Sequence, residues 1–358
     1  MEDAKVQRQN KPGHQISMPA LKECFKDHPI LNTETTEDLE NCGFCNSCIS
    51  VHLYPTTAAN GDCYSFRQCR NCDGVFLSPK PNPEQLSNAY SSHYYGESTK
   101  KFIGPVEWVI DRFRSGRARL VSAKLGTNAR VLDLGCGNGG FLANLSKLGI
   151  DAHGIELPGG SAERAVALSN ITVHVGTLKN SNYVNQKFDA ITLWHVFEHL
   201  ETPRDTLDLI VKMLKPGGRL YLSLPNPDSF QARLFKGDWL HHDPPRHLFY
   251  LGPQAMQREL EQLGLLMESK SFWSMEQNPF GIIQSILNKF HSERDILYES
   301  LKGNCEISSR YSKLQILKHK IIGTALVPFA VVAATLESAV GRGGTMELVF
   351  TSPVDNKK

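Results

Sequence analysis

The chain has 358 residues, 41% of them hydrophobic, so it is long enough to bury a sizeable core and to form one large domain with a smaller one. Its 39 Lys and Arg side chains nearly balance its 37 Asp and Glu side chains, and the formal net charge is +2. This balance argues against the broad basic surface with which a protein recognises nucleic acid.

The N-terminal segment, residues 1–38, is rich in Lys, Gln, Asp, Glu and Thr and has little apolar periodicity. Such a composition predicts a mobile tail. Its first 20 residues lack the apolar core of a signal peptide. We therefore expect a cytoplasmic protein.

Six of the nine cysteines lie between residues 42 and 72. In a chain for which no signal peptide is expected, such clustering suggests metal binding rather than disulfides. Cys42, Cys45, Cys69 and Cys72 form two Cys-x-x-Cys pairs with β-rich sequence between them. Four such thiolates can bind one Zn²⁺, and a module of this size has too little core to fold without a crosslink. The pattern predicts a zinc ribbon over residues 39–80.

Cys48 offers an alternative ligand, since Cys45 and Cys48 have the same spacing as Cys42 and Cys45. We favour Cys42 because Asn46-Ser47 resembles the Gly-Ser that commonly follows the first pair in zinc ribbons. Catalytic thiols are the rival explanation, but paired Cys-x-x-Cys motifs suit a closed structural site better.

Residues 81–128 are predicted to form a connector followed by N-terminal helices. The prolines of Pro79–Pro83 predict a stiff connector rather than a strand. An amphipathic pattern over Val106–Leu125 predicts a helix. Its solvated face is expected to carry four arginines, Arg112, Arg114, Arg117 and Arg119.

The stretch Val131–Phe141 changes from a short apolar strand to a glycine-rich turn and then to an apolar-periodic helix. Glycines at 135, 137 and 140 let the backbone turn tightly and bring a ligand against bare main chain. The helix that follows offers unpaired N–H groups at its start. The pattern predicts a pocket for a nucleotide-like cofactor.

Two acidic residues bear on which cofactor this is. Glu156 follows the second predicted strand, about where an acid would hold ribose hydroxyls, and this fits NAD and S-adenosylmethionine equally well. Asp133 precedes the first glycine and would repel the pyrophosphate of a dinucleotide. It would instead favour S-adenosylmethionine, whose amino-acid end carries an ammonium and whose sulfur is cationic.

Residues 131–139 resemble the first motif of the class I S-adenosylmethionine-dependent methyltransferases, and Lys215–Asn226 resembles the fifth-strand motif of that family. Asp73–Pro83 resembles the zinc-ribbon extension that precedes the catalytic domain in a bacterial group of these enzymes, of type 11, 12 and 23, related to ubiquinone-pathway O-methyltransferases. The resemblance implies an α/β fold with a seven-stranded Rossmann-like sheet whose last strand is antiparallel.

The resemblance also implies where the cofactor binds. Asp133, Gly135 and Gly137 are expected to face its methionine end, Glu156 its ribose, and Thr177 and Leu178 its adenine. Trp194 and His195 would flank the sulfonium, and Cys136 and Leu157 are also expected to contact the cofactor.

Strand and helix patterns alternate from residue 130 onward, which predicts a parallel sheet with helices on both faces. A further helix is expected over 252–263. The catalytic domain is predicted to comprise 129–275 and 344–353. Its strands are expected at 130–134, 152–156, 171–175, 188–194, 218–224, 265–272 and 345–352.

A helical insertion is predicted over residues 276–343, before the last strand. Within it Ile321–Leu336 contains no charged residue, but it is shorter than the roughly 20 residues that cross a bilayer, and Pro328 lies in its middle. Three interpretations stay open: a helix buried against the domain, a dimer face, or an interfacial segment that reaches lipid-linked substrates. The preceding Lys313, Lys318 and Lys320 keep open the interpretation that this segment contacts the inner face of the membrane. The sequence does not determine the oligomeric state.

Candidate catalytic residues follow the fourth strand. His195, Glu198 and His199 have the i, i+3, i+4 spacing that would place them on one face of a helix, and His247 lies in the proline-stiffened segment Trp239–Leu248. The set resembles the Glu-x-x-Glu-His motif and distant His that bind a divalent metal in small-RNA 2′-O-methyltransferases, a motif partly shared by ubiquinone-pathway O-methyltransferases. Here His195 replaces the first acid, which would favour a softer ion than Mg²⁺.

Three roles remain for this cluster. A histidine could act as general base on a substrate hydroxyl, a divalent metal could acidify that hydroxyl, or the residues could shape the cofactor site without proton chemistry. The predicted function is methyl transfer to a hydroxyl, or a carbon, of a small-molecule, glycan or lipid-linked acceptor. The alternatives are an NAD-dependent oxidoreductase and a zinc-ribbon binding module with a vestigial cofactor domain.

Overall fold

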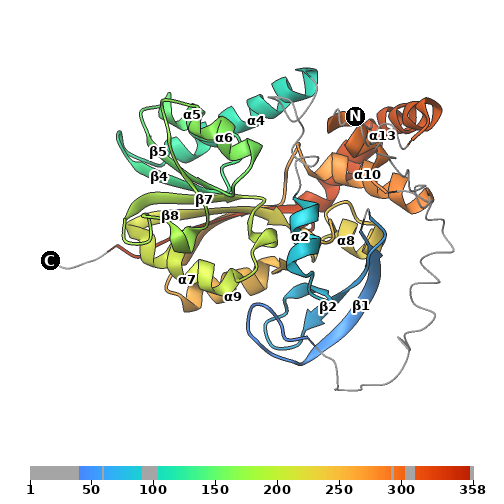
Figure 1. The fold of residues 1–358 in the computed structure, drawn as a ribbon, viewed down its shortest axis with the longest axis horizontal. Helices are drawn as coiled ribbons and strands as arrows, with labels where there is room; N and C mark the ends of the chain where they lie inside the picture. Colours follow the sequence, from blue (N-terminus) through green and yellow to red (C-terminus); the bar gives the residue numbers. More distant parts are fainter. Residues whose placement is uncertain (1–39, 59, 91–103, 292–293, 303–310, 355–358) are drawn as a thin grey trace, which may run out of the picture.

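The structure, a computed structural model, describes residues 40–58, 60–90, 104–291, 294–302 and 311–354 (Figure 1). The tail predicted over residues 1–38 lies outside these ranges. Two sheets organise the described residues, one of seven strands and one of four.

The seven-stranded sheet has the order β10-β11-β8-β7-β4-β5-β6. Strand β11 runs antiparallel to both of its neighbours, while the pairs from β8 through to β6 are parallel. The predicted fold class, including the antiparallel last strand, is confirmed. The strands are β4 (Arg130–Leu134), β5 (Asp151–Glu156), β6 (Thr172–Val175), β7 (Phe188–Trp194), β8 (Leu214–Pro225), β10 (Leu266–Ser271) and β11 (Thr345–Thr351).

Strand β8 begins four residues earlier than predicted, because Leu214 pairs with Phe188 before the register shifts to match Ala190 with Arg219. The Pro-Gly-Gly segment therefore lies inside the strand as the structure has it. Gly217 takes a φ of 74°, a conformation that suits glycine.

Helices cover both faces of this sheet (Figure 1). Successive side chains of a strand point to opposite faces, so Val131 packs against one helical layer and Leu132 against the other. The first layer contains α4 (Gly104–Ser122), α5 (Gly140–Ser146) and α6 (Gly160–Val166). The second contains α7 (Pro203–Met213) and α9 (Pro253–Gln262).

The four-stranded sheet has the order β1-β2-β3-β9 and contains a strand that the sequence did not suggest. The first three strands belong to the N-terminal segment, but β9 is Phe249–Tyr250 and pairs antiparallel with Val75 and Phe76 of β3. A Cβ atom on Gly74 would lie 2.4 Å from the Phe249 ring, so glycine permits this approach. The bounds are β1 (Ser50–Thr57), β2 (Cys63–Cys69), β3 (Val75–Ser78) and β9 (Phe249–Tyr250), with α2 (Pro83–Ala89) after β3.

Between β10 and β11 the chain is helical, as the sequence predicts for the insertion. Its described helices are α10 (Asn278–Phe290), α11 (Ile296–Lys302) and α13 (Lys313–Ala339). Pro328 lies within α13 and does not end it. By length and composition alone α13 could cross a membrane, and only 22% of its most apolar window is buried. One face of α13 packs against the insertion, and most of the rest of the helix is exposed.

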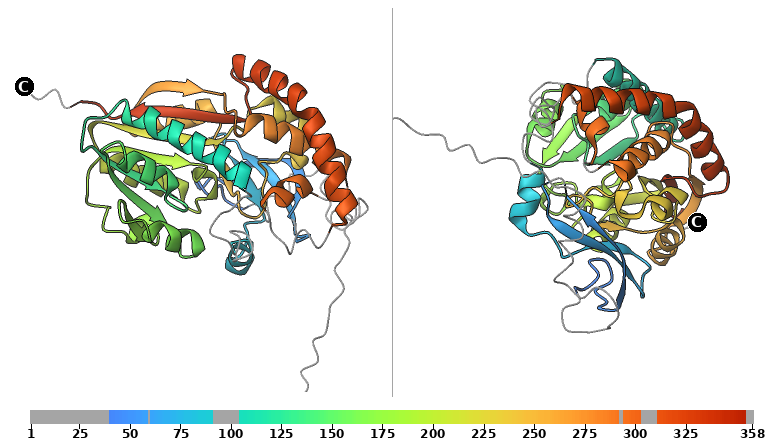
Figure 2. Two further views of the ribbon diagram at one scale, coloured as in Figure 1. Left: turned by 90° about the horizontal axis from the view of Figure 1, so that it is seen from above. Right: turned by 90° about the vertical axis from the view of Figure 1, so that its right-hand side faces the viewer.

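The N-terminal sheet and the insertion lie at the same end of the large sheet, away from the C-terminus (Figures 1 and 2). Because β11 is antiparallel and ends near the C-terminus, this is the end where the parallel strands have their carboxyl ends. Short connecting segments complete this region: α8 (Phe230–Phe235) and the 3₁₀ turns η2 (Leu178–Asn180), η3 (Phe197–His199) and η4 (Lys236–Asp238).

Candidate active site and cysteine cluster

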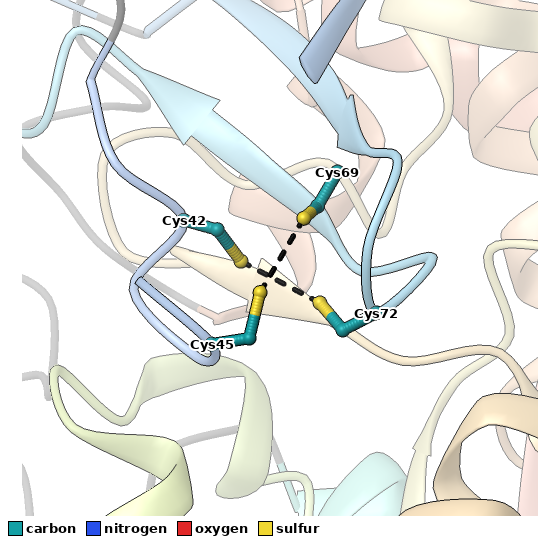
Figure 3. Close-up of side chains that lie close together, drawn as sticks. All are labelled: Cys42, Cys45, Cys69 and Cys72. Atoms are coloured by element: carbon teal, nitrogen blue, oxygen red, sulfur yellow. Dashed lines mark hydrogen bonds between the residues drawn. The ribbon is translucent and has the colours of Figure 1, made fainter. Parts of the chain in front are cut away.

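The four predicted zinc ligands converge in the structure (Figure 3). Their Sγ atoms lie within 4.8 Å of one another, with Cys42 3.6 Å from Cys72 and Cys45 3.5 Å from Cys69. Cys48 is exposed and outside this group. The hydrogen bond from Cys72 lowers the pKa of the Cys42 thiol, although burial opposes the shift. Four converging thiols, three of them buried, fit a tetrahedral structural metal site.

Each cysteine pair lies on a tight backbone turn. The Asn46 amide donates to the Cys42 carbonyl at 2.9 Å, and the Cys69 amide donates to the Gly74 carbonyl at 2.8 Å. Asn46 and Asp73 take φ angles of 59° and 61°, which Asn and Asp tolerate better than most residues. These local turns bring the two sulfurs of each pair to one side.

The glycine-rich motif forms a bare backbone turn at the carboxyl end of β4. Gly135 and Gly137 have φ angles of 71° and 58°. A Cβ atom on Gly135 would lie 2.5 Å from Val196, so no side chain fits there. The amides of Gly135 and Cys136 donate to the Ile155 carbonyl, which holds the turn against β5.

Asp133 lies under this turn and is 2% exposed. Thr192 donates a hydrogen bond of 2.6 Å to its Oδ1. Burial raises the pKa of Asp133 to about 7, against the hydrogen bond from Thr192, which lowers it. A buried carboxyl with a raised pKa gains most from a cation placed beside it, because the cation stabilises the ionised form.

The other predicted cofactor residues divide into two groups. Gly135, Cys136, Gly137, Trp194 and His195 line a cavity of about 660 Å³ together with Asp133. The residues assigned to ribose and adenine are not among its lining residues: Glu156, Leu157, Thr177 and Leu178.

Glu156 nevertheless lies next to the glycine turn. Its carboxylate accepts hydrogen bonds from the amides of Gly137 at 2.6 Å and Leu157 at 3.0 Å. The carboxylate thus lies beside the turn, at the end of β5, where ribose hydroxyls are expected. Its role in binding ribose, like those of Thr177 and Leu178 on adenine, stays a prediction.

The candidate catalytic residues follow β7 without forming an α-helix. His195 has a φ of 56°, and Phe197–His199 form a 3₁₀ turn. The three residues therefore do not share one face of an α-helix, the arrangement that their spacing suggested. Their side chains converge all the same. His195 Nδ1 lies 3.4 Å from Glu198 Oε1, and ligand atoms of Glu198, His199 and His247 lie within 4.8 Å of one another.

Backbone carbonyls orient two of these histidines. The Nδ1 atom of His199 is 3.0 Å from the Arg246 carbonyl, and that of His247 is 2.7 Å from the His241 carbonyl. Since a carbonyl only accepts, each Nδ1 must carry a proton, and in the neutral imidazole Nε2 then has the lone pair. The Tyr90 hydroxyl also lies 3.0 Å from His199 Nδ1.

The charges of this cluster would allow it to bind a cation or to accept a proton. Glu198 is completely buried, and burial alone would raise its pKa, but His195, His247 and His199 together lower it to about 2. Burial and the neighbouring His247 lower the pKa of His199 to about 4. At neutral pH the site therefore holds an ionised carboxylate beside a neutral imidazole.

Two further residues of the cavity were missed or misplaced by sequence reasoning. His241 lines the cavity, and its Nε2 has no hydrogen-bond partner among the described residues. Arg117 was expected on a solvated face, but it forms a 2.7 Å ion pair with Glu276 and lies 5.0 Å above the Trp194 ring. The helical periodicity identified α4 but gave no sign that the insertion would cover it.

Residues 106–270 match the model of a family described as a methyltransferase domain. A ubiquinone biosynthesis O-methyltransferase of Aeromonas salmonicida is 25% identical over 154 residues, which cover 40% of this chain and 65% of that protein. The corresponding enzyme of Xanthomonas axonopodis is 29% identical over 170 residues, covering 43% and 70%. The matched region thus spans about two thirds of these relatives.

Solved structures are also similar. A methyltransferase of Archaeoglobus fulgidus has a TM-score of 0.41 and 18% identity, covering 68% of this chain and 94% of that one. The magnesium protoporphyrin IX methyltransferase of Synechocystis, solved with bound S-adenosylhomocysteine, has a TM-score of 0.40 and 17% identity, covering 53% and 88%.

Proposed function

We propose that this chain is a class I S-adenosylmethionine-dependent methyltransferase and that it transfers the methyl group to a hydroxyl of a small-molecule, glycan or lipid-linked acceptor. The observation that carries the proposal is one cavity that is lined both by Asp133 and the glycine turn and by Glu198, His199 and His247. A cofactor site thus adjoins a site for proton chemistry.

The cofactor side suits a cationic ligand. Asp133 is buried and would ionise beside the ammonium of the methionine end, while a diphosphate would meet the same carboxyl at close range. This supports S-adenosylmethionine over a nicotinamide dinucleotide. Trp194 lines the same cavity and would pack beside the sulfonium, as a π-face suits a cation.

The acceptor side must aim an oxygen at the methyl carbon and remove its proton. Methyl transfer is an in-line displacement, so the acceptor oxygen must come within about 3–3.5 Å of that carbon. We assign His195 as general base: its Nδ1 faces Glu198 and its Nε2 has no hydrogen-bond partner among the described residues. Glu198 would stabilise the protonated imidazole.

The donor set also fits a divalent metal. Glu198, His199 and His247 offer one buried carboxylate and two imidazole Nε2 lone pairs fixed by carbonyls. When bound there, such an ion would lower the pKa of a coordinated hydroxyl. Two imidazoles suit a transition metal such as zinc or iron better than Mg²⁺. With or without the ion, these residues hold the acceptor end of the cavity.

For the cysteine cluster we propose a structural zinc ion. Its module holds the segment that carries His241 and His247, since β9 pairs with β3 and the Tyr54 hydroxyl lies 2.8 Å from His242 Nε2. The zinc would act on catalysis by fixing this segment, not by contacting the substrate.

The decisive experiment measures cofactor uptake and transfer separately. Calorimetry should show binding of S-adenosylhomocysteine and none of NAD; the reverse would refute the proposal. Methyl-labelled S-adenosylmethionine is then incubated with a cell extract, and the labelled product is identified. His247→Asn should abolish labelling, whereas His174→Asn, on β6 and outside the residues that line the cavity, should not.

The presence of a metal site is tested by binding, and its role by combining that result with transfer activity. Titration of Zn²⁺ or Mn²⁺ into the protein with its cysteine site already filled should show one further site that His247→Asn removes. If no such site exists but His195→Asn still abolishes transfer, the general base acts alone. If neither variant changes transfer, the cluster only shapes the cofactor site.

A further inference from the structure

The outward face of α13 is apolar and uncovered. Within the uncharged stretch Ile321–Leu336, four large side chains are about 60–65% exposed: Ile321, Phe329, Val332 and Leu336. Large side chains that recur on one face of a helix are unlike the scattered apolar residues of an ordinary surface. A face of this kind marks a site of interaction.

The opposite face of the same helix is buried against the rest of the protein. Residues His319, Gly323, Ala330, Ala334 and Glu337 recur at intervals of three, four or seven, which places them on one face of the helix, and they are buried. Ala330 and Ala334 pack with α10, and a Cβ atom on Gly323 would lie 2.7 Å from Leu297 of α11. A helix that packs one apolar stripe on its own protein would normally be polar on the other side. Here both sides are apolar.

The accessible charge of α13 is entirely positive. Lys313, Lys318 and Lys320 are exposed in its first turns and, within the part of the chain that the structure describes, form no ion pair. The only acid in the helix is Glu337, which is buried and accepts a hydrogen bond from Gln231. An apolar face that begins among unpaired lysines complements an anionic lipid surface, with acyl chains below and phosphates beside the ammonium groups.

The insertion connects this face to the active site. Phe280 of α10 and Tyr298 and Leu301 of α11 line the active-site cavity, while α13 packs on the other side of these helices. Figure 2 shows α13 running along the outside of the insertion. Only α13 itself and the layer formed by α10 and α11 therefore lie between the cavity and the uncovered face.

We propose that the outward face of α13 docks on an anionic lipid bilayer, lying in its interface, and that the enzyme takes a hydroxylated amphiphile from that bilayer as its methyl acceptor. The second half of this inference rests on the proposed function; the docking does not. The interface is favoured over a membrane span because the stripe from His319 to Glu337 is packed on α10 and α11, and a spanning helix would have to leave them.

Vesicle co-sedimentation of the full chain tests the docking. We expect binding to vesicles of phosphatidylcholine and phosphatidylglycerol in equal parts, and much weaker binding to phosphatidylcholine alone. Replacing all three lysines by Gln should weaken binding to the anionic vesicles on the order of a hundredfold, at about fivefold for each charge. The test variant for the apolar face combines Ile321→Ser, Phe329→Ser and Leu336→Ser.

The matched control removes exposed apolar side chains elsewhere: Leu148→Ser, Val166→Ser and Val354→Ser, at positions 45%, 55% and 69% exposed. It should bind vesicles like the parent, and circular dichroism should show that both variants stay folded. Docking is refuted if the parent binds neither kind of vesicle, or if the test and control variants lose binding equally. If light scattering shows that the parent and the control variant are dimers and the α13 variant is a monomer, and the parent does not bind vesicles, the face would be assigned to contact with a second copy.

The two proposals fail in different ways. Calorimetry with S-adenosylhomocysteine, carried out on the α13 variant, should give the parent affinity. Cofactor binding without vesicle binding would overturn the docking alone. Vesicle binding without cofactor binding would overturn the proposed function and leave the docking in place.

Discussion

Replacing Glu198 by Gln is the sharpest test of the proposed chemistry. The carboxylate is fully buried, lies 3.4 Å from His195 and is held ionised by three histidines, which lower its pKa to about 2. Gln fills nearly the same volume but removes the negative charge. The variant therefore loses the group that would stabilise a protonated His195 and one of three donors for a metal.

The expected loss follows from this geometry. A positioned proton acceptor contributes typically about 10²–10⁴-fold, or roughly 3–5 kcal/mol in activation free energy. We expect kcat to fall within that range. The dissociation constant for S-adenosylmethionine should change by less than about threefold, because Asp133 and the glycine turn are untouched.

The assay is transfer of labelled methyl to the acceptor, with cofactor binding measured by calorimetry on the same sample. Glu259→Gln is the matched control, since Glu259 is also buried but pairs with Arg204 at 2.6 Å, on α9 and outside the residues that line the cavity. The reasoning is refuted if Glu198→Gln keeps more than a tenth of parental kcat, or if the control loses as much.

Three other perturbations probe separate parts of the molecule. Asp133→Asn should weaken S-adenosylmethionine binding roughly ten- to a hundredfold, the worth of about 1.5–3 kcal/mol for a hydrogen bond to a charged group, and unchanged affinity in calorimetry would contradict its role. Cys45→Ser, or removal of metal with a strong chelator, should lower the free energy of unfolding by several kcal/mol in urea titrations and abolish transfer, whereas Cys48→Ser should do neither. Burial raises the pKa of Glu337 to about 7, so the folded state binds its proton more tightly than the unfolded chain, and the stability of the parent should fall as pH rises from about 4.5 to 7. Glu337→Gln should make this fall shallower without removing it, because Asp133 also has a raised pKa and contributes with the same sign. An unchanged profile of melting temperature against pH would refute the assignment.

The large sheet was predictable because its strands are local patterns. Arg130–Leu134 and Phe188–Trp194 are apolar runs that begin and end as the sequence suggests, and β11 was placed by its resemblance to the family. Strand β9 was not predictable. It is two residues long, and it is a strand only because Val75 and Phe76 lie beside it, a pairing with residues 249 and 250 that no local pattern encodes.

The candidate site was predictable in composition and less so in geometry. Spacing identified His195, Glu198, His199 and His247 but suggested a helix where the structure has a 3₁₀ turn, since a left-handed His195 turns the chain sharply after β7. His241 was overlooked because one of two adjacent histidines carries no signal of its own. The exposure of α13 was also hidden, because an uncharged run is equally compatible with burial and with a lipid surface.

The strand Phe249–Tyr250 has a consequence for how the protein is made. Since it completes the sheet that β1, β2 and β3 begin, the cysteine module leaves the ribosome well before its fourth strand has been translated. Until then Val75 and Phe76 present an unpaired edge, and the face that Phe249 will cover stays bare. The thiols can bind metal early, but the module's edge closes only when the catalytic domain arrives. Truncation between the two would therefore yield a fragment prone to associate through that edge.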